Sequence, residues 1–292
     1  MTFRAWMMAL RLRTLPIPTI QVLTGTALGY SFTGHINITI ALFTWLVAVF
    51  ITFGTNLIND VFDFEKGGDS LNRVGHLKVI TAGYLSKAQV HRGGLILFAL
   101  AIFCSIPLII HSSWWMLPIV LISVACGYCY TGGPYPICYI GLSEVFIFIF
   151  YGGVCVISSF YVQAGFISGA SILLAVQMGM LAILSSALNN LRDIFEDADV
   201  QKLTLAVRFG SFFARCEILF MAIVPFILNF GWFLLGYHKA ALMPLILLPL
   251  ALFFVYGVWL SERGAILNRY FALGVLIHFL FGFLLIIGLL NQ

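Results

Sequence analysis

The amino-acid sequence predicts an all-α fold: a polytopic bundle of about nine transmembrane helices forming a single domain. Three observations support this prediction: the composition, the apolar runs, and the side on which the basic residues fall. Of 292 residues, 62% are hydrophobic and only 9% are charged, and the mean hydropathy is +1.06. Soluble domains carry about 25% charged residues, so this chain cannot cover a surface that faces water. The apolar character also extends over the whole chain, which distinguishes it from a soluble enzyme behind a signal peptide.

Apolar runs without charge define the expected helices, because crossing the hydrocarbon takes about 20 apolar residues in a helix. The runs cover residues 14–33, 38–58, 94–111, 114–131, 142–162, 170–188, 217–236, 241–260 and 270–290. The connections between them are short except at 59–93 and 189–216. No linker or low-complexity segment interrupts the chain, so we expect one domain over residues 1–292.

Basic residues fall almost entirely on one side of this nine-span topology. Fourteen of the 15 Lys and Arg residues lie in the N-terminal segment or in three connections on the same side, and only Lys239 lies opposite. The positive-inside rule makes the basic side cytoplasmic and places the C-terminus outside. Removing or adding one early span would disrupt this partition, so the charge distribution also supports the helix assignment.

Acidic residues cluster on the same side, where topology gives no reason for them. Asp and Glu contribute little to orientation, yet eight of the eleven acids fall in two connections. The first connection contains Asp60, Asp63, Glu65 and Asp69, and the second contains Asp193, Glu196, Asp197 and Asp199. Clusters of this kind require an explanation beyond membrane orientation.

The spacing within each cluster suits a divalent cation. Asp60 and Asp63 are three residues apart and Asp193 and Asp197 are four apart, so each pair lies on one face of a helix that extends the preceding apolar run. Like charges so placed repel, and more strongly where water is scarce. A divalent cation reverses that repulsion, and Mg²⁺ prefers oxygen ligands that include phosphate and water. One such cluster could belong to an ordinary solvated loop. Two clusters of similar arrangement are harder to explain in that way.

Neutral and basic side chains accompany the acids in both connections. Asparagines precede the acids at Asn56, Asn59, Asn189 and Asn190, and basic residues include Lys66, Arg73, Lys78, Arg192, Lys202 and Arg208. Asparagine supplies a ligand or donor without adding charge. Metal ions and cationic side chains together can stabilise the charge of a leaving phosphate group. The two connections therefore predict a site for a diphosphate bridged by magnesium.

At these residues the sequence resembles the UbiA superfamily of intramembrane aromatic prenyltransferases. The first loop is similar to the family's ND-x-x-D motif at Asn59, Asp60 and Asp63, and Asp69 matches the branch that prenylates 1,4-dihydroxy-2-naphthoate. The second loop resembles that branch's NN-x-RD-x-x-x-D pattern in residues 189–197, followed by KxTLAVRxG in residues 202–210.

Two further stretches support the resemblance. RLRTLP in residues 11–16 is similar to the branch's N-terminal signature, and YTGGPYPICYIGLSEVF in residues 130–146 is similar to its connection between the fourth and fifth spans. Gln201 and Leu203 depart from the pattern, where glycine and a basic residue are usual. These departures concern one phosphate contact and a local turn, and they leave the acidic positions intact.

The resemblance implies a fold and an activity. The helices would surround a central cavity capped by the cytoplasmic Asp-rich loops. The prenyl tail would lie among the helices and reach the lipid bilayer sideways. The reaction would be the Mg²⁺-dependent transfer of a polyprenyl group from polyprenyl diphosphate to 1,4-dihydroxy-2-naphthoate with decarboxylation, giving demethylmenaquinone. This activity implies the inner membrane of a bacterium and no nucleic-acid partner.

The resemblance also implies roles for individual residues. The carboxylates that hold one or two magnesium ions would be Asp60, Asp63, Asp69, Asp193 and Asp197. The side chains that bind the substrates would be Asn56, Asn59, Lys78, Asn189, Asn190, Arg192, Lys202 and Glu144. The catalytic set would be Asp60, Asp63, Asp193, Asp197 and Tyr130.

Tyr130 and Glu144 rest on weaker signals than the aspartates. Tyr130 lies beside the Gly132–Gly133–Pro134 turn, where its ring can shield a carbocation or its hydroxyl can bind the diphosphate. Simple packing is an equal alternative in a chain that is 15% aromatic. Glu144 is an acid near the start of an apolar run, which is costly and usually functional. It would contact the aromatic acceptor or anchor a neighbouring loop.

Two other functions remain as alternatives. A member of the same superfamily could act on a different ring, such as 4-hydroxybenzoate or homogentisate. An ion-coupled transporter would also use paired acids to bind a cation. Transporters place such acids near the bilayer midplane, whereas these lie at the ends of apolar runs.

Overall fold

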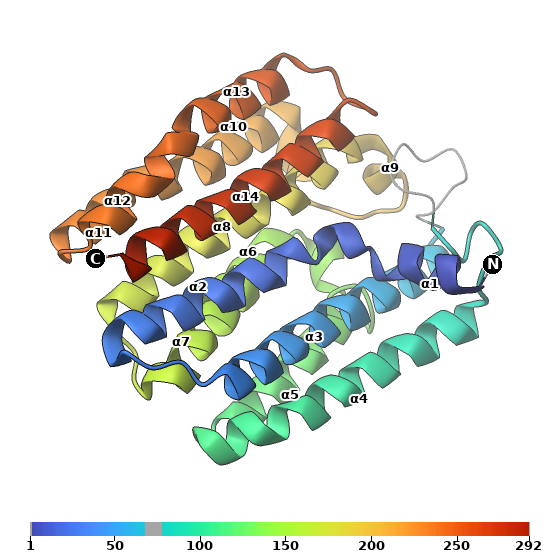
Figure 1. The fold of residues 1–292 in the computed structure, drawn as a ribbon. Helices are drawn as coiled ribbons and strands as arrows, with labels where there is room; N and C mark the ends of the chain where they lie inside the picture. The colour runs from blue at the N-terminus through green and yellow to red at the C-terminus, as the bar shows by residue number, and fades with distance from the viewer. Residues whose placement is uncertain (1, 68–77, 292) are drawn as a thin grey trace.

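The computed structural model describes residues 2–67 and 78–291, and within these ranges all regular structure is helical (Figure 1). Nine rods occupy the described part of the chain, one for each predicted apolar run. They are α2 (Pro16–Thr33), α3 (Ile38–Glu65), α4 (Lys87–His111), α5 (Met116–Cys129), α6–η3–α7 (Ser143–Ala164), α8 (Gly169–Arg192), α10–α11 (Leu205–Leu234), α12–η4–α13 (His238–Leu260) and α14 (Leu267–Leu290). The all-helical membrane bundle predicted from the sequence is confirmed.

Seven of these rods are long and apolar enough to cross a membrane, by length and composition. The other two differ for separate reasons. The α5 helix has only 14 residues. The α2 helix has 18 residues but carries several hydroxyl side chains and an amide, and of these Gln21, Thr24 and Thr26 are buried in the bundle.

Short polar side chains define where several helices begin. Asn37, Ser86, Ser168 and Thr204 each accept a hydrogen bond from a backbone N–H in the first turn of α3, α4, α8 and α10, respectively. These caps satisfy N–H groups that have no partner within the helix. Each of these four helices therefore begins at a defined residue after the connection from the preceding helix.

The α8 helix is the centre of the bundle, because 78% of its most apolar 18-residue stretch is buried. It packs against α10, η3 and α14, while α3 lies along α4 and α2 contacts α14 and α7. A buried amide in α8 links it to the next rod: Gln177 donates to Asn229 Oδ1 (2.9 Å) and accepts from Trp232 Nε1 (2.6 Å). The buried amide of Gln177 is thus paired across helices, as buried polar groups require.

The rods alternate in direction, so one end of the bundle collects the long connections. This end, here called the polar rim, contains α1 (Thr2–Leu10), η1 (Leu12–Thr14), η2 (Ile137–Ile140), α9 (Ile194–Asp199) and the connection between α13 and α14. Figure 1 shows the N-terminus at the rim and the C-terminus at the other end of the bundle. The last turn of α3 and the end of α8 bring both aspartate pairs to the rim.

Candidate active site

A cavity of about 280 Å³ extends from the polar rim into the bundle, between α2, α3, α5, the α6–η3–α7 rod and α8. Charged and amide side chains line its mouth, whereas Val47, Leu108, Met116, Val120 and Val162 line its far end. Asn59 at the mouth and Thr44 near the far end are 15 residues apart on α3. At 1.5 Å per residue this separation is about 22 Å. The cavity is therefore long, polar at one end and apolar at the other.

Two aspartates of the first loop lie buried in the last turns of α3, as the spacing predicts. Lys78 Nζ lies 2.7 Å from Asp63 Oδ2 and 3.6 Å from Asp60 Oδ1. Arg11 pairs with Asp60 and donates to Asn59 Oδ1 (2.7 Å). Buried carboxylates require such partners because desolvation of an isolated charge is costly.

The Arg11 backbone takes a left-handed conformation (φ 54°, ψ 55°) between α1 and η1. This conformation is unfavourable for residues other than glycine and is often found at functional sites. Here it accompanies the turn that brings Arg11 onto the end of α3. The sequence motif RLRTLP includes Arg11 but gave no indication of this contact.

The second pair of aspartates lies at the junction of α8 and α9. Arg192 contacts Asp193 through two hydrogen bonds (Nε to Oδ1, 2.6 Å; Nη2 to Oδ2, 2.8 Å) and also donates to Asn268 Oδ1 (2.6 Å). Lys202 Nζ lies 3.2 Å from Asp197 Oδ1. We expected a continuous helix over this pair, but Asp193 ends α8 in a non-helical conformation, and the Asp197 N–H to Asp193 O bond (2.8 Å) starts α9.

Tyr139 on η2 joins the two loops. Its hydroxyl donates to Asp63 Oδ1 (3.0 Å), and its carbonyl accepts from the Leu203 N–H of the second loop (3.0 Å). Lys66 Nζ lies 3.7 Å from the centre of its ring. Burial and the charge of Asp63 raise the pKa of Tyr139, so the hydroxyl stays a donor. Residues 130–146 carried the family resemblance, but spacing alone gave no reason to prefer Tyr139 over Tyr130.

Arg208 and Gly141 fix this bridge in place. The Arg208 guanidinium donates to the carbonyls of Ile140 and Leu203, both at 3.0 Å. Gly141 has φ 76°, and a Cβ there would lie 2.8 Å from Leu203 O. Glycine is therefore required for η2 to approach the second loop this closely.

Most of the predicted site residues line the cavity. They are Asn56, Asn59, Asp63, Lys78, Tyr130, Asn189, Asn190, Arg192, Asp193 and Lys202. Asp60 and Asp197 are buried and contact the lining cations Arg11 and Lys202. Asp69 lies outside the described residues. The structure thus brings both loops to one cavity mouth, at the ends of the helices. An ion-coupled transporter would instead place its paired acids near the bilayer midplane.

Glu144 is buried beside the cavity and accepts a hydrogen bond from Asn190 Nδ2 (2.6 Å). Its other oxygen has no hydrogen-bond partner among the described residues. The contact ties the start of α6 to the polar end of α8. Of the two roles expected for Glu144, its contact with Asn190 supports the anchoring one.

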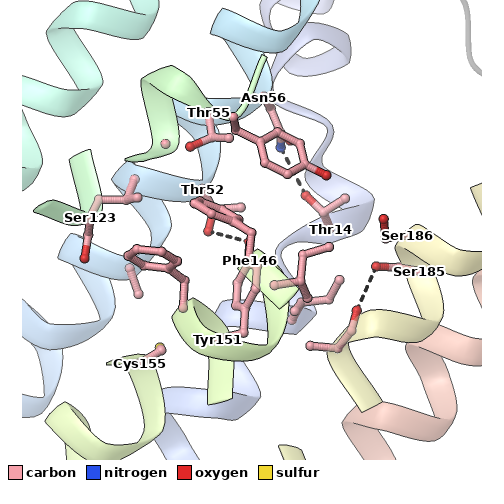
Figure 2. A pocket seen from close by; sticks show the side chains of 18 of the residues that line it. Thr14, Thr52, Thr55, Asn56, Ser123, Phe146, Tyr151, Cys155, Ser185 and Ser186 are labelled. Atoms are coloured by element: carbon pink, nitrogen blue, oxygen red, sulfur yellow. Dashed lines mark hydrogen bonds between the residues drawn. The ribbon is translucent and has the colours of Figure 1, made fainter. Parts of the chain in front are cut away.

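Tyr130 contributes to an aromatic wall that descends from the mouth. Its ring centre is 5.1 Å from that of Phe146, which lies 4.4 Å from that of Phe150. Tyr151 also faces the cavity, where its hydroxyl lies 3.0 Å from that of Thr52 (Figure 2). Near the mouth, burial raises the pKa of the Cys138 thiol to about 12, so this group is neutral at physiological pH.

The carboxylates offer a divalent metal the hard oxygen donors it prefers. Within residues 2–67 and 78–291, no three acidic, histidine or cysteine side chains form a preformed metal-ligand group. Each of the four buried aspartates instead contacts a Lys or Arg. The same mouth therefore combines metal-type donors with cations suited to phosphate oxygens.

Known proteins resemble this chain in sequence and in fold. Residues 20–274 match the UbiA prenyltransferase family. The chain is 32% identical to the 1,4-dihydroxy-2-naphthoate octaprenyltransferase of Haemophilus influenzae, over 98% of this chain and 96% of the relative. It is 33% identical to the enzyme of the same name from Escherichia coli, over 73% of this chain and 70% of the relative.

Solved structures share the arrangement of helices. A UbiA homolog from Aeropyrum pernix K1 superposes with a TM-score of 0.74 at 14% identity, covering 95% of this chain and 98% of the homolog. A UbiA homolog from Archaeoglobus fulgidus, bound to DMAPP and Mg²⁺, gives a TM-score of 0.62 at 18% identity, with coverage of 96% and 98%. Sequence and fold agree over nearly the whole length, and the chain belongs to the UbiA prenyltransferase family.

Proposed function

We propose that this protein transfers a polyprenyl group from polyprenyl diphosphate to 1,4-dihydroxy-2-naphthoate, with loss of the ring carboxylate, to give a demethylmenaquinol, the reduced diol form of demethylmenaquinone. The observation that carries this proposal is the cavity, which has carboxylates and cations at its mouth and apolar side chains in its depth. A polyprenyl diphosphate is divided in the same way, into a charged diphosphate head and an apolar prenyl tail. The naphthoate acceptor is supported by the names of relatives that are 32–33% identical.

Magnesium would be held by Asp60, Asp63, Asp193 and Asp197, together with Asp69 from the first loop. The oxygen donor set, buried and shared between two loops, fits this ion. When bound, magnesium supplies positive charge that stabilises the leaving diphosphate. The magnesium-bound structure of a relative with the same fold is consistent with this assignment.

The side chains at the mouth hold the diphosphate and direct its departure. Lys78, Arg192 and Lys202 line the cavity and present N–H donors to phosphate oxygens. The allylic C–O bond breaks, and its electron pair leaves on the diphosphate. Electrons of the naphthoate ring form the new C–C bond to the prenyl carbon. The pair from the bond to the carboxylate carbon returns to the ring as CO₂ departs.

The aromatic wall protects the reacting carbon. Tyr130, Phe146 and Phe150 line the cavity as a series of neighbouring rings. Ring faces stabilise cations, and a cavity enclosed by apolar side chains excludes the water that would otherwise capture the allylic cation.

The site would face the cytoplasm from the inner membrane of a bacterium. Among the Lys and Arg residues that the structure describes, all but Lys239 lie on the side of the polar rim in the nine-rod arrangement. The positive-inside rule supports a cytoplasmic rim. Diphosphate and naphthoate would then reach the site from the cytoplasmic side, with the prenyl tail in the bilayer.

A direct assay tests the reaction. Purified protein with 1,4-dihydroxy-2-naphthoate, a prenyl diphosphate and Mg²⁺ should release CO₂ and form the prenylated naphthalenediol, with 4-hydroxybenzoate offered in parallel as the competing acceptor. Asp60→Asn and Asp193→Asn should lower kcat by about 100-fold or more, because charge stabilisation at the leaving group is lost. Asp199→Asn, an exposed acid of the same loop, should retain activity.

Three results would contradict the proposal. These are the absence of prenylated naphthoate with the unaltered protein, preferential prenylation of 4-hydroxybenzoate, and undiminished activity in both Asp60→Asn and Asp193→Asn.

A further inference from the structure

We propose that neutral hydroxyl side chains, one helical turn inside the asparagines of the cavity mouth, bind the acceptor ring, and that Tyr151 hydrogen-bonds the 4-hydroxyl of that ring. The inference rests on the proposed function, because it assigns a position in the cavity to the acceptor of that reaction. It makes Tyr151 the residue that distinguishes acceptors by this hydroxyl.

On α3, hydroxyl side chains follow the asparagines toward the interior of the bundle. Thr52 and Thr55 lie four residues before Asn56 and Asn59, respectively, and all four side chains line the cavity. Residues four apart share one face of a helix, and four residues rise by about 6 Å. The two threonines therefore lie one turn farther from the polar rim than the two asparagines.

The α8 helix repeats this order on another wall of the cavity. Ser185 and Ser186 lie four residues before Asn189 and Asn190, respectively, and these side chains also line the cavity. Figure 2 shows both serines on α8, bordering the same pocket as the threonines of α3. The four residues at this level, Thr52, Thr55, Ser185 and Ser186, are here called the hydroxyl tier.

The hydroxyl tier marks the boundary between the polar and the apolar parts of the cavity. One turn deeper, Ala48 and Ile51 of α3 and Ala182 of α8 line the cavity. In the other direction, Asp60 lies eight residues after Thr52 on α3, a rise of about 12 Å. The tier therefore lies between the place proposed for the diphosphate and the place proposed for the prenyl tail.

Two hydroxyls of the tier are available to a ligand. The side chain of Ser186 is buried, with 9% exposure, and neither its hydroxyl nor that of Thr55 forms a hydrogen bond within residues 2–67 and 78–291. Burial of a hydroxyl without a partner is costly. A prenyl tail has no group that could bond to it, and phosphate oxygens have charged partners at the mouth. Neutral hydroxyls at this depth therefore suit the ring hydroxyls of the acceptor.

Tyr151 reaches the tier from a third element. It lies in η3, whose π-helical geometry often occurs at functional sites, and its hydroxyl is 3.0 Å from that of Thr52 on α3 (Figure 2). The bond to Thr52 fixes the position of the Tyr151 oxygen. A hydroxyl that shares one hydrogen bond can form a second one. The pair therefore presents an oriented phenol group to a ligand in the cavity.

The acceptor has one hydroxyl that requires such a partner. In 1,4-dihydroxy-2-naphthoate the 1-hydroxyl is adjacent to the carboxylate and can donate to it within the molecule, whereas the 4-hydroxyl cannot. A hydrogen bond from the 4-hydroxyl to Tyr151 would hold the ring at the hydroxyl tier. Phe146 and Phe150, whose ring centres are 4.4 Å apart, line the cavity beside it. The acceptor carbon would then lie next to the allylic carbon, between the diphosphate and the tail.

Two stable probes test this assignment in the absence of prenyl diphosphate. The first, 4-hydroxy-2-naphthoate, retains the 4-hydroxyl, whereas 2-naphthoate lacks it, and isothermal titration measures both affinities. Tyr151→Phe should weaken binding of the hydroxylated probe by about three- to tenfold, the loss of one neutral hydrogen bond. Its affinity for 2-naphthoate should stay within about twofold of that of the unaltered protein. Tyr256→Phe is the matched control, because Tyr256 is 65% exposed on α13, and it should change neither affinity.

A second variant leaves the phenol in place. Thr52→Val keeps the shape of the side chain and removes the hydroxyl that orients Tyr151. It should weaken binding of 4-hydroxy-2-naphthoate by about two- to fivefold and leave 2-naphthoate binding nearly unchanged. In the complete reaction, both variants should raise the KM for 1,4-dihydroxy-2-naphthoate by similar factors, while the KM for the prenyl diphosphate stays within about twofold.

Three results would overturn the inference. The unaltered protein could bind both probes equally, Tyr151→Phe could leave the affinity for the hydroxylated probe unchanged, or both variants could weaken the two probes by the same factor. The last result would mean that the pair only supports the shape of the cavity.

The same measurements separate this inference from the proposed function. If the unaltered protein fails to prenylate the naphthoate but loses its preference for 4-hydroxy-2-naphthoate in Tyr151→Phe, the proposed function fails and the hydroxyl site stands. If prenylation occurs and Tyr151→Phe changes neither probe binding nor the KM for the naphthoate, the function stands and the site is wrong.

Discussion

At the scale of single residues, the site is built from buried charges that compensate one another. Asp60, Asp63, Asp193 and Asp197 are buried, and each contacts a Lys or Arg. Removing one member of such a pair costs about 3–5 kcal/mol, since it leaves a buried charge uncompensated. Well-packed apolar residues would give equal or greater stability at these positions. The charges are therefore better explained by ligand binding than by stability of the fold.

Tyr139 connects two loops that are distant in sequence, through its contacts with Asp63 and Leu203. Tyr139→Phe removes the hydroxyl that donates to Asp63 and leaves the ring under Lys66 and the backbone bond to Leu203. We expect the apparent affinity for Mg²⁺ to fall by about tenfold, because groups that orient a metal ligand contribute this much. The concentration of Mg²⁺ at half-maximal activity and calorimetric binding of Mn²⁺ would measure the change.

Tyr135→Phe is the matched control, since Tyr135 is 79% exposed. It should leave metal affinity unchanged. Because a merely structural role for Tyr139 would lower the melting temperature without changing metal affinity, a normal Mg²⁺ dependence in Tyr139→Phe would contradict its positioning role.

At the scale of elements, the width of the cavity depends on how closely η3 approaches α8. The η3 segment (Phe148–Val156) is π-helical, a geometry that often occurs at functional sites. A Cβ on Gly152 would lie 2.8 Å from Gly179 Cα of α8, so two glycines meet where the rods cross. Small residues permit such close packing of helices in membranes. The same segment presents Phe150, Tyr151 and Cys155 to the cavity.

Two adjacent glycines of η3 provide a controlled test of this packing. Gly152→Ala should destabilise the protein by about 1–3 kcal/mol, because the added methyl group forces η3 and α8 apart. Gly153→Ala places its methyl group where nothing lies within 4 Å and should leave the stability nearly unchanged or slightly increased. Thermal unfolding of both variants in the same detergent compares them directly. Equal melting temperatures would show that the crossing tolerates a side chain at Gly152.

At the scale of the whole molecule, nine rods place the chain termini at opposite ends of the described structure (Figure 1). The polar rim gathers both aspartate pairs, and the apolar part of the cavity extends away from it along α3. This arrangement orients an amphipathic substrate with its charged head at the rim. It also makes the position of the rim relative to the membrane a testable property of the entire fold.

Reporter fusions in a bacterial host test this orientation. A fusion after Gln292 should give active periplasmic alkaline phosphatase and a dark green fluorescent protein, because the C-terminus is expected outside. A fusion in the connection between α13 and α14, after Glu262, should give the reverse pattern. The same pattern at both positions would mean that α14 does not cross the membrane, and a reversed pair would place the rim outside.

The sequence by itself determined the helical membrane class, the approximate positions of the nine rods and the two acidic loops, whereas α10 begins at Leu205, 12 residues before the predicted run. These features are local: an apolar run long enough to cross the hydrocarbon and carboxylates three or four residues apart can be read from neighbouring positions. The resemblance at residues 59–69 and 189–210 added the family and the individual roles expected of these residues.

Only the tertiary structure decided which distant groups meet. Arg11 reaches Asp60, Tyr139 bridges Asp63 and Leu203, and Arg13 lies on Phe271 of the last helix. No spacing rule relates these positions, because they depend on how antiparallel rods pack and where their ends coincide. The break at Asp193 has the same origin, since the segment after α9 joins η2 through the Leu203 N–H bond to the Tyr139 carbonyl. Cavity depth, too, follows from packing between α3, α5 and α7, and it determines how much of a prenyl tail lies inside the protein.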